Sequence, residues 1–380
     1  EILGVTRATL YAYVSRRGIR SVPVEGTRQR LYWDSDVRDA RRPPGRPRRD
    51  ATTAQVESSV SLIDGDRLYF RGEDAIALSE WATLEDVAER LWQAQARTVT
   101  ACLPVELPSA ARTMLEATAS RSGIERAATV LGLVEADSPR AFDLSAGGMA
   151  ARGAAAGRER ARLLLPRNGL GKGPLHVLVA RHLDLPPVWE DVIRRLLVLS
   201  ADHGLEPVTL AVRAMAGVGI TPYRAIAGGL LVLGGRQSIL TRAEHIRDLF
   251  GEIQTRGVRP TMIERLRREG GIPGFGSDLY AAGDPRARAL WDVLAPLCDR
   301  DPELHALRDA VAFVREELGQ EPSFALFVHA VTQRVMPDRR DTLFALGRSV
   351  GWVAHAIERY CAGEQKRAAG HYSGPLPGDR

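Results

Sequence analysis

The stretch from Gly274 to Arg286 holds residues suited to binding a small anion. It reads GFGSDLYAAGDPR, a glycine-rich turn followed by a Gly-Asp-Pro-Arg break that cannot continue a helix. The hydroxyl of Ser277 can donate a hydrogen bond but cannot serve as a general base near neutral pH. The guanidinium of Arg286 can hold a carboxylate through two parallel hydrogen bonds. By its residues alone, this stretch predicts a loop.

The same loop resembles the active-site segment of citrate synthases, in which GFGH is followed by a tyrosine and DPR. Ser277 stands where that family carries the histidine that polarises the ketone of a 2-oxo acid. The resemblance covers roughly residues 58–375 and implies the large and small helical domains of the family. It also implies condensation of a thioester with a ketone, for which the family uses an aspartate base and two histidines.

Serine occupies each position at which the resemblance places an acid or a base. The segment LGGRQSI aligns with the family's GPLHGGAN and puts Ser238, or Gln237 if the register slips, at the enol-stabilising histidine. The segment EPSFAL puts Ser323 at the catalytic aspartate. Ile239 and Leu240 replace the glycines that admit coenzyme A. No catalytic residue of the family is intact, and coenzyme A is expected only as a co-substrate if the protein is active.

The substrate-binding positions of the family are better preserved. The resemblance assigns them to Ser200, His203, Arg286, Arg348 and Arg367. Ser200 replaces the first histidine of the family's HADHEL segment, and His203 keeps the second, whose role is mainly structural. In the family the arginine matched by Arg367 reaches into the partner subunit's site. These matches predict a di- or tricarboxylate ligand and a homodimer, and the alternative for each arginine is a surface salt bridge.

A second GPLH sequence, Gly173–His176, does not fit the resemblance. It precedes the segment that carries His203, and Val177 and Leu178 follow it instead of glycines. His176 fits the start of an amphipathic helix, and we interpret it as incidental.

Helices are predicted to position these residues, because hydrophobic residues recur with helical period through most of the chain. The clearest spans are Leu115–Ala136, Val188–Ser200, Val208–Val218, Ala243–Arg256 and Leu343–Tyr360. Two short strands are expected on either side of the Asp64-Gly65 turn, and Thr83 is expected to cap a helix over Leu84–Trp92. Residues 137–175 read as a loose excursion rich in Ala, Gly and Arg.

The predicted fold class is therefore all-α in the body, with citrate-synthase-like large and small helical domains and a small N-terminal winged helix-turn-helix. The large domain is assigned to residues 58–235 and 336–380, and the small domain to residues 236–335.

Residues 1–40 read as helix, turn, helix, short ribbon and helix. They resemble the winged helix-turn-helix of MerR-like and excisionase-like proteins. That resemblance assigns DNA contacts to Arg7, Thr9, Tyr11, Tyr13, Arg16, Arg17, Arg28 and Arg30. Arg28 and Arg30 would lie on the wing and touch phosphates. The alternative is a small helical cap that only packs on the main body.

The charge distribution also separates the N-terminus from the body. Residues 1–50 contain 12 Arg against 6 Asp and Glu, a balance of +6, whereas the whole chain carries +5. A basic segment on a near-neutral body predicts DNA binding through residues 1–50. Residues 41–57 are expected to form an extended Arg- and Pro-rich linker. Within it, PGRPR resembles the AT-hook core, and the alternative is a solvated spacer.

Composition limits the class of protein and its surroundings. A chain of 380 residues with 44% hydrophobic residues can bury sizeable cores in two or three units. No run of 18 apolar residues occurs, so no membrane span is predicted. Cys102, Cys298 and Cys361 lie too far apart for a metal motif or a disulfide framework. We therefore expect a cytoplasmic protein without a metal site or a bound cofactor.

Three functions stay open at the level of the sequence. The substituted catalytic positions favour a DNA-binding regulator or carboxylate sensor. The second is an active citrate- or methylcitrate-synthase-type acyltransferase that condenses acetyl-CoA or propionyl-CoA with oxaloacetate. The third is a structural partner that forms mixed dimers with an active paralogue.

Overall fold

The computed structural model divides the chain into two compact units, Glu1–Glu57 with Lys366–Arg380 and Ser58–Gln365. It describes residues 21–23, 30–32, 56–95, 107–164, 173–235, 239–277, 279–337 and 342–363. In the first unit, β1 (Ser21–Pro23) pairs antiparallel with β2 (Arg30–Tyr32). The rest of the predicted helix-turn-helix and nearly all of the linker lie outside the described residues.

A small sheet opens the second unit. Strands β3 (Ser61–Asp64), β4 (Arg67–Phe70) and β5 (Glu73–Asp74) form an antiparallel sheet in that order. Its first two strands confirm the hairpin expected around the Asp64-Gly65 turn, where Gly65 has a φ of 55°. The sequence did not predict β5, and the sheet corrects an all-α description to a mostly helical one.

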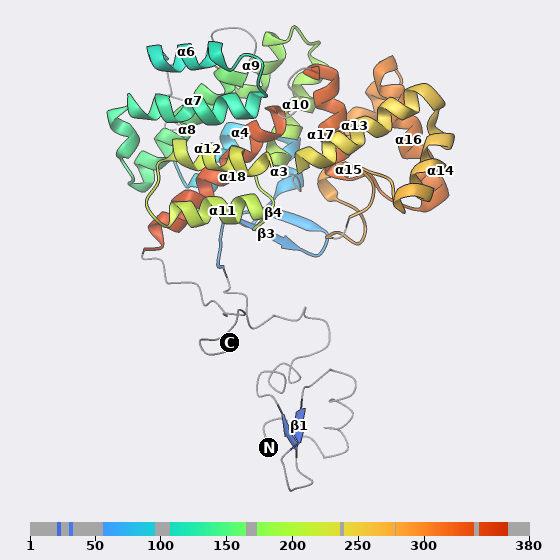
Figure 1. Cartoon of the computed structure of the whole chain (residues 1–380), viewed down its shortest axis with the longest axis horizontal. Coiled ribbons are helices and arrows are strands. Elements are labelled where there is room, and N and C mark those ends of the chain that lie inside the picture. Colours follow the sequence, from blue (N-terminus) through green and yellow to red (C-terminus); the bar gives the residue numbers. More distant parts are fainter. Residues whose placement is uncertain are drawn as a thin grey trace, which may run out of the picture. The chain divides into compact units, whose positions relative to one another are not determined.

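Helices build the rest of this unit (Figure 1). They are α3 (Ala75–Trp81), α4 (Leu84–Trp92), α6 (Ser109–Ala117), α7 (Gly123–Ala136), α8 (Ala146–Leu164), α9 (Leu175–His182), α10 (Val188–Ser200), α11 (Pro207–Ala216), α12 (Pro222–Leu233), α13 (Ile239–Arg256), α14 (Val258–Glu269), α15 (Pro285–Cys298), α16 (Pro302–Leu318), α17 (Phe324–Val335) and α18 (Thr342–Cys361), with a short 3₁₀ turn at Pro139–Phe142.

Most predicted helical spans coincide with observed helices, to within a few residues at their ends. The exception is Leu115–Ala136, which is divided between α6 and α7, because Ser122 begins a new helix with its own capping box. Thr83 caps α4 as expected, and its hydroxyl accepts a hydrogen bond from the backbone N–H of Asp86. Helix ends are thus set locally by capping side chains.

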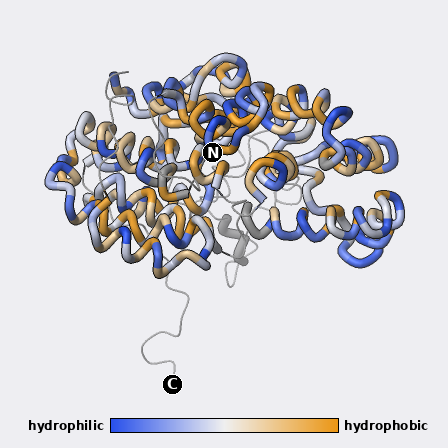
Figure 2. Tube along the Cα trace, turned by 90° about the horizontal axis from the view of Figure 1, so that it is seen from above, coloured by the Kyte–Doolittle hydropathy of each residue, from blue (hydrophilic) through white to orange (hydrophobic). Residues whose placement is uncertain are grey.

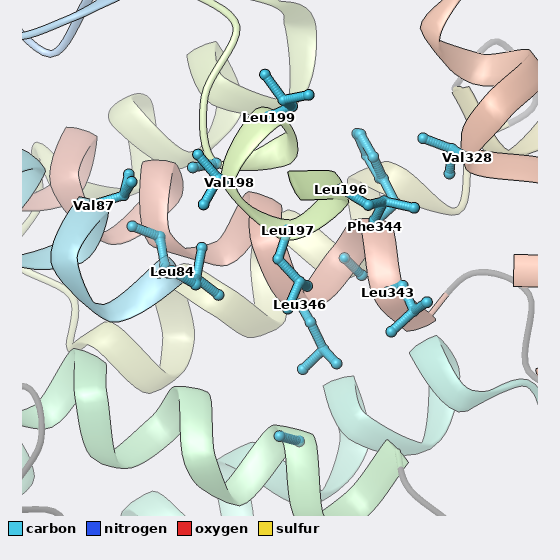
Figure 3. Packing of buried hydrophobic residues seen from close by; sticks show 14 of the residues in the cluster. Leu84, Val87, Leu196, Leu197, Val198, Leu199, Val328, Leu343, Phe344 and Leu346 are labelled. Atoms are coloured by element: carbon cyan, nitrogen blue, oxygen red, sulfur yellow. The ribbon is translucent and has the colours of Figure 1, made fainter. Parts of the chain in front are cut away.

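Helix α18 lies at the centre of the main hydrophobic core. Its residues are buried from Thr342 to Ile357, and it packs against α4, α8, α10, α11 and α12. Figure 3 shows Leu196 and Leu197 of α10 near Leu343 and Leu346 of α18. A fully buried helix of this kind fixes the positions of its polar side chains as well as its apolar ones.

Glycines allow the helices to approach α18 closely. A Cβ on Gly347 would lie 2.6 Å from the carbonyl oxygen of Leu197, and one on Gly229 would lie 2.5 Å from the Trp352 ring. Both distances are too short for any side chain, so these crossings require glycine. The α10–α18 crossing brings Ser200, at the end of α10, next to the turn of α18 that carries Arg348.

The expectation of a loose excursion over residues 137–175 is wrong for most of its length. Residues Ala146–Leu164 form α8, which packs against α7, α12 and α18. Alanine and arginine are strong helix formers, and the small residues on α8 permit close packing. At Gly153, for example, an added Cβ would lie 2.6 Å from a methyl carbon of Val353, so the absence of a side chain permits this contact.

A second, smaller hydrophobic cluster joins α13, α14 and α16. It consists of Leu249, Ile253, Met262, Ile272, Ala310 and Val314. These helices lie together at one end of the unit in Figure 1, and Figure 2 shows that end as largely hydrophilic on its outer turns. Helices α15 and α17 also contribute to the main core, and the domain boundaries given above stay a prediction.

Among the described residues, no helix combines the length and apolar composition needed to cross a membrane.

Candidate functional site

A cavity of about 850 Å³ collects the side chains that the sequence had singled out. Six of them line it: Ser200, His203, Ser277, Arg286, Ser323 and Arg348. They come from the ends of α10, α15 and α17, from the middle of α18, and from the loops around His203 and Ser277. The tertiary structure therefore brings together residues that are up to about 150 positions apart in the sequence.

Backbone pairing holds the loops that carry Ser277 and Ser323 beside each other. Phe275 forms an isolated antiparallel bridge with Pro322. On either side of it, the N–H of Gly276 donates to the carbonyl of Glu321 and the N–H of Ser323 donates to that of Gly274, both at 2.8 Å. These contacts fix the glycine-rich loop on the N-terminus of α17.

Both serines in these loops line the cavity. Ser277 Oγ accepts the N–H groups of Leu279 and Tyr280, at 3.2 and 3.1 Å. Its own proton is therefore left to donate elsewhere. Ser323 is the N-cap residue of α17, yet its side chain makes no capping hydrogen bond. Both can donate to a ligand, and neither can remove a proton from carbon.

Arg286 is buried, with 7% of its surface exposed, and is paired within its own helix turn. Its Nε and Nη2 donate to the carboxylate of Asp284 at 3.1 and 2.7 Å. Its guanidinium carbon lies 4.5 Å from the centre of the Phe324 ring. Nη1 donates to none of the described residues. Arg286 therefore keeps the two N–H groups of Nη1 for a ligand.

Arg348 is buried more deeply, with 1% exposed, and it is held by two carboxylates. Nη1 donates to Asp202 at 2.9 Å and Nε donates to Glu206 at 2.8 Å. Nη2 donates to the hydroxyl of Thr209 at 3.0 Å. A guanidinium with these partners is rigidly placed, and its charge is already compensated inside the protein.

The Asp202 carboxylate connects Arg348 to further buried polar groups. His355 Nε2 lies 3.2 Å from it, and the hydroxyl of Ser61 also donates to it. Burial alone would raise the pKa of Asp202, but the charge of Arg348 and the hydrogen bond from His355 hold it well below its usual range. Asp202 is therefore ionised at neutral pH.

This network of buried polar side chains extends from His355 to Ser58 and Ser59, at the start of the second unit. Arg213 Nη1 donates to His355 Nδ1 at 3.0 Å and also pairs with Glu358. Glu358 in turn accepts hydrogen bonds from Ser58 and Ser59. Burial would raise the pKa of Glu358, but the N–H of Ser59 and the guanidinium of Arg213 lower it to about 2.

His203 is a neutral, hydrogen-bonded imidazole in the cavity wall. Its Nε2 lies 2.8 Å from the hydroxyl oxygen of Tyr280. Burial, together with the charges of Arg286 and Arg348, lowers the pKa of His203 well below its usual value. Burial also raises the pKa of Tyr280 to about 12, so its hydroxyl keeps its proton.

Ser200 is a residue of the cavity wall with a buried, unsatisfied polar atom. The residue is 1% exposed, and its Oγ makes no hydrogen bond with any residue that the structure describes. A buried hydroxyl without a partner costs about 1–3 kcal/mol relative to one that is hydrogen-bonded. Because Ser200 lines the cavity, a bound molecule could supply that partner.

Sequence reasoning missed several residues in the cavity wall, among them Glu206, Arg242 and His245. Arg242 and His245 are one turn apart on α13, and that spacing on a helix after the LGGRQSI segment was the available signal. His176, by contrast, is a buried residue near the start of α9 and does not line the cavity.

Several assigned positions lie outside the described residues. They are Arg7, Thr9, Tyr11, Tyr13, Arg16, Arg17, Arg28, Gln237, Ser238 and Arg367. Arg30 lies in β2, and Ile239 and Leu240 lie in the first turn of α13, but their side chains are not described. No group of three or more potential metal ligands occurs among the described residues.

Known proteins resemble this chain over most of its length. Residues 51–368 match the family model described as citrate synthase, C-terminal domain. The chain belongs to the citrate synthase family. Citrate synthase 2 of Bacillus subtilis is 25% identical over 352 residues, which cover 84% of this chain and 93% of the relative. Putative citrate synthase 2 of Mycobacterium tuberculosis is 28% identical over 195 residues, covering 47% of this chain and 50% of the relative.

Solved citrate synthases share the fold. The Thermotoga maritima enzyme superimposes with a TM-score of 0.69 at 21% identity, over 87% of this chain and 96% of its own. The Thermoplasma acidophilum citrate synthase, solved with carboxymethyl coenzyme A and oxaloacetate, gives a TM-score of 0.71 at 19% identity, over 86% and 95%. The comparisons support family membership and favour the condensing enzyme over the DNA-binding regulator that the sequence had favoured.

Proposed function

We propose that the cavity binds a small di- or tricarboxylate. The observation that carries this proposal is the buried, unpartnered hydroxyl of Ser200 in a cavity that also contains Arg242, Arg286 and Arg348. The free Nη1 of Arg286 and the Ser277 hydroxyl are hydrogen-bond donors that a carboxylate would accept. A volume of about 850 Å³ lies within the usual range for small-molecule sites, about 300–1,000 Å³.

Thermal stability tests this proposal directly. A ligand that binds only the folded protein stabilises it by about 2.7 kcal/mol at a concentration of 100 times its Kd. We expect oxaloacetate or citrate to raise the Tm of the purified full chain. If oxaloacetate, citrate and other di- or tricarboxylates all leave the Tm unchanged at millimolar concentration, the proposal is wrong.

The variant Ser200→Ala should distinguish a role of the unpartnered Ser200 hydroxyl in ligand binding from a role of Ser200 in packing. Without ligand, we expect the variant to be as stable as the wild type or up to about 1 kcal/mol more stable, since an unsatisfied buried group is removed. Its affinity for oxaloacetate should fall about tenfold, because a charge-assisted hydrogen bond is lost. Urea denaturation and calorimetry measure the two effects.

Ser79→Ala is the matched control for Ser200→Ala. Ser79 is also fully buried, but its hydroxyl donates to the carbonyl of Ile76 at 2.7 Å, and it does not line the cavity. This control should lose about 1 kcal/mol of stability and keep its ligand affinity. If Ser200→Ala behaves in the same way, Ser200 has no role in binding.

Condensation of a thioester with oxaloacetate is the second candidate function. It is favoured by the family and by relatives named citrate synthase, one of which is covered over 93% of its length. In this candidate the carboxylates and imidazoles of the described cavity wall are those of Glu206, Asp284, neutral His203 and His245. None of them occupies the position that the resemblance assigns to the base.

DNA binding through residues 1–50 is a further proposal, supported by the basic composition of that segment. Replacing Arg28 and Arg30 with Ala in the full chain should weaken binding to duplexes of unrelated sequence alike. The slope of the logarithm of the binding constant against the logarithm of the salt concentration should also become shallower, by about one unit for each lost phosphate contact. Equal affinity and slope in a mobility-shift titration of both proteins would contradict this role.

We also propose a homodimer, which sedimentation of the purified protein tests. Leu210 on α11, Leu231 on α12 and Val218 between them are exposed to 40%, 68% and 77%, which suits a buried interface between subunits. A monomer at micromolar concentration would contradict it.

A further inference from the structure

Glu206 holds the guanidinium of Arg348 in the cavity wall. Its Oε1 accepts a hydrogen bond from Arg348 Nε at 2.8 Å and lies 2.7 Å from Nη2. Nη2 also donates to the hydroxyl of Thr209, and Nη1 donates to Asp202. All three nitrogens of the guanidinium are therefore engaged by the protein itself. While Glu206 stays in place, Arg348 cannot hold the carboxylate of a ligand through two parallel hydrogen bonds.

Glu206 is the displaceable partner of this arginine. Its side chain is 30% exposed and lines the cavity, whereas that of Asp202 has no exposed surface. Asp202 is also held by His355 and Ser61. Among the residues that the structure describes, the Glu206 side chain has no hydrogen-bond partner other than Arg348. A ligand that reaches Arg348 from the cavity therefore displaces Glu206 more easily than Asp202.

The backbone gives Glu206 a second place for its carboxylate. Glu206 is the N-cap residue of α11, and its side chain makes no capping hydrogen bond while it pairs with Arg348. The first N–H groups of a helix have no acceptor within the helix, and the helix dipole favours negative charge at that end. A Glu206 carboxylate that leaves Arg348 therefore stays in favourable surroundings at the start of α11, and this lowers the cost of its displacement.

We propose that Glu206 is an internal competitor for an acidic ligand and sets the affinity of the cavity for carboxylates. This inference rests on the proposed carboxylate binding and adds a regulatory contact to the same site. The carboxylates of Glu206 and of the ligand carry the same charge and require the same N–H groups of Arg348, so each excludes the other. The ligand binds Arg348 only when the Glu206 side chain has moved away from the guanidinium. Glu206 thus keeps the affinity for acids below the value that Arg348 would otherwise give.

Calorimetric titration of the full chain with citrate tests this inference in the wild type, Glu206→Gln, Glu206→Ala and the control Glu252→Gln. Loss of the charge in Glu206→Gln should lower the Kd for citrate about tenfold, because like charges brought together in a binding site reduce affinity. Glu206→Ala also removes the oxygen that accepts from Arg348, so its Kd should be lower still. Both variants keep Asp202 and Thr209 as partners of Arg348.

Glu252 matches Glu206 in exposure and in its kind of partner. Its side chain is 31% exposed and pairs with that of Arg265, which is 8% exposed, but neither residue lines the cavity. Glu252→Gln should therefore leave the Kd for citrate unchanged. If it lowers the Kd as much as Glu206→Gln does, the net charge alone explains the gain, and the inference is overturned.

The direction of the change separates competition from a structural role. If Glu206 only holds Arg348 in position, its replacement should raise the Kd for citrate, so an unchanged or raised Kd in both variants overturns the inference. Equal Kd values in Glu206→Gln and Glu206→Ala would overturn it as well, because the charge would then act without the contact.

The same titrations distinguish this inference from the proposed carboxylate binding. Binding of citrate by the wild type with no gain in the Glu206 variants leaves the proposed function intact and refutes the competition. Binding by Glu206→Gln but not by the wild type supports the competition and refutes carboxylate binding by the unmodified protein. If no variant and no wild-type protein binds citrate, the inference is wrong.

Discussion

The purified protein is expected to release thiol from acetyl-CoA, in the presence of oxaloacetate, at less than about 0.01 s⁻¹. A typical enzyme turns over at ~10 s⁻¹, and one positioned acid or base contributes about 10²–10⁴-fold. Ser323 occupies the position that the resemblance assigns to the base, and its hydroxyl cannot remove a proton from carbon near neutral pH. Loss of that one group already accounts for the expected rate.

A thiol-detecting assay on the unmodified full chain measures this rate, and omission of oxaloacetate controls for hydrolysis. The variant Ser277→His should not restore turnover, because a polarised ketone has no partner when no enol is formed. A rate within tenfold of ~10 s⁻¹ for the wild type would contradict the expectation. It would establish the condensing enzyme as the function and point to Glu206 or His203 as the groups to replace next.

Among the substitutions proposed for this protein, Arg348→Met should cause the largest decrease in the free energy of unfolding, about 3–5 kcal/mol. The change removes the guanidinium that pairs with Asp202 and Glu206, and Asp202 has no exposed surface. A buried charge left without its partner is strongly destabilising. Urea denaturation of the unliganded protein measures the loss. The control Arg247→Met removes an exposed ion pair and should change stability by less than about 0.5 kcal/mol.

The pH dependence of this loss follows from the pKa of Asp202. In the wild type the folded-state pKa lies below the ordinary value, so its contribution is present at neutral pH and is lost as the pH falls toward the folded pKa. In Arg348→Met, protonation would remove the unpaired charge, and the destabilisation should shrink as the pH falls.

A second substitution tests the same explanation. Adding Asp202→Asn to Arg348→Met should recover part of the stability, because the unpaired charge is removed. If Arg348→Met costs less than about 1 kcal/mol, or if the double variant is no more stable than the single one, the buried pair does not explain the stability.

The sequence determined the parts of this protein that depend on short-range order. Helices α10 and α18 follow from the period of their apolar residues, and the cap at Thr83 follows from side chains within one helical turn. The motif around Ser277 was sufficient to indicate the citrate synthase family. Such features depend on residues close to each other in the chain, and a linear pattern contains them.

Only the tertiary structure decided the charge state of the cavity. The sequence suggested Arg286 and Arg348 as anion holders, but it could not show that Arg348 pairs with Asp202, 146 residues away. Nor could it show that Arg242 lies in the cavity wall without such a partner among the described residues. Whether an arginine is free or neutralised depends on which segments the fold places within hydrogen-bond distance. That distance is set by the packing of α18 against α10 and not by position along the chain.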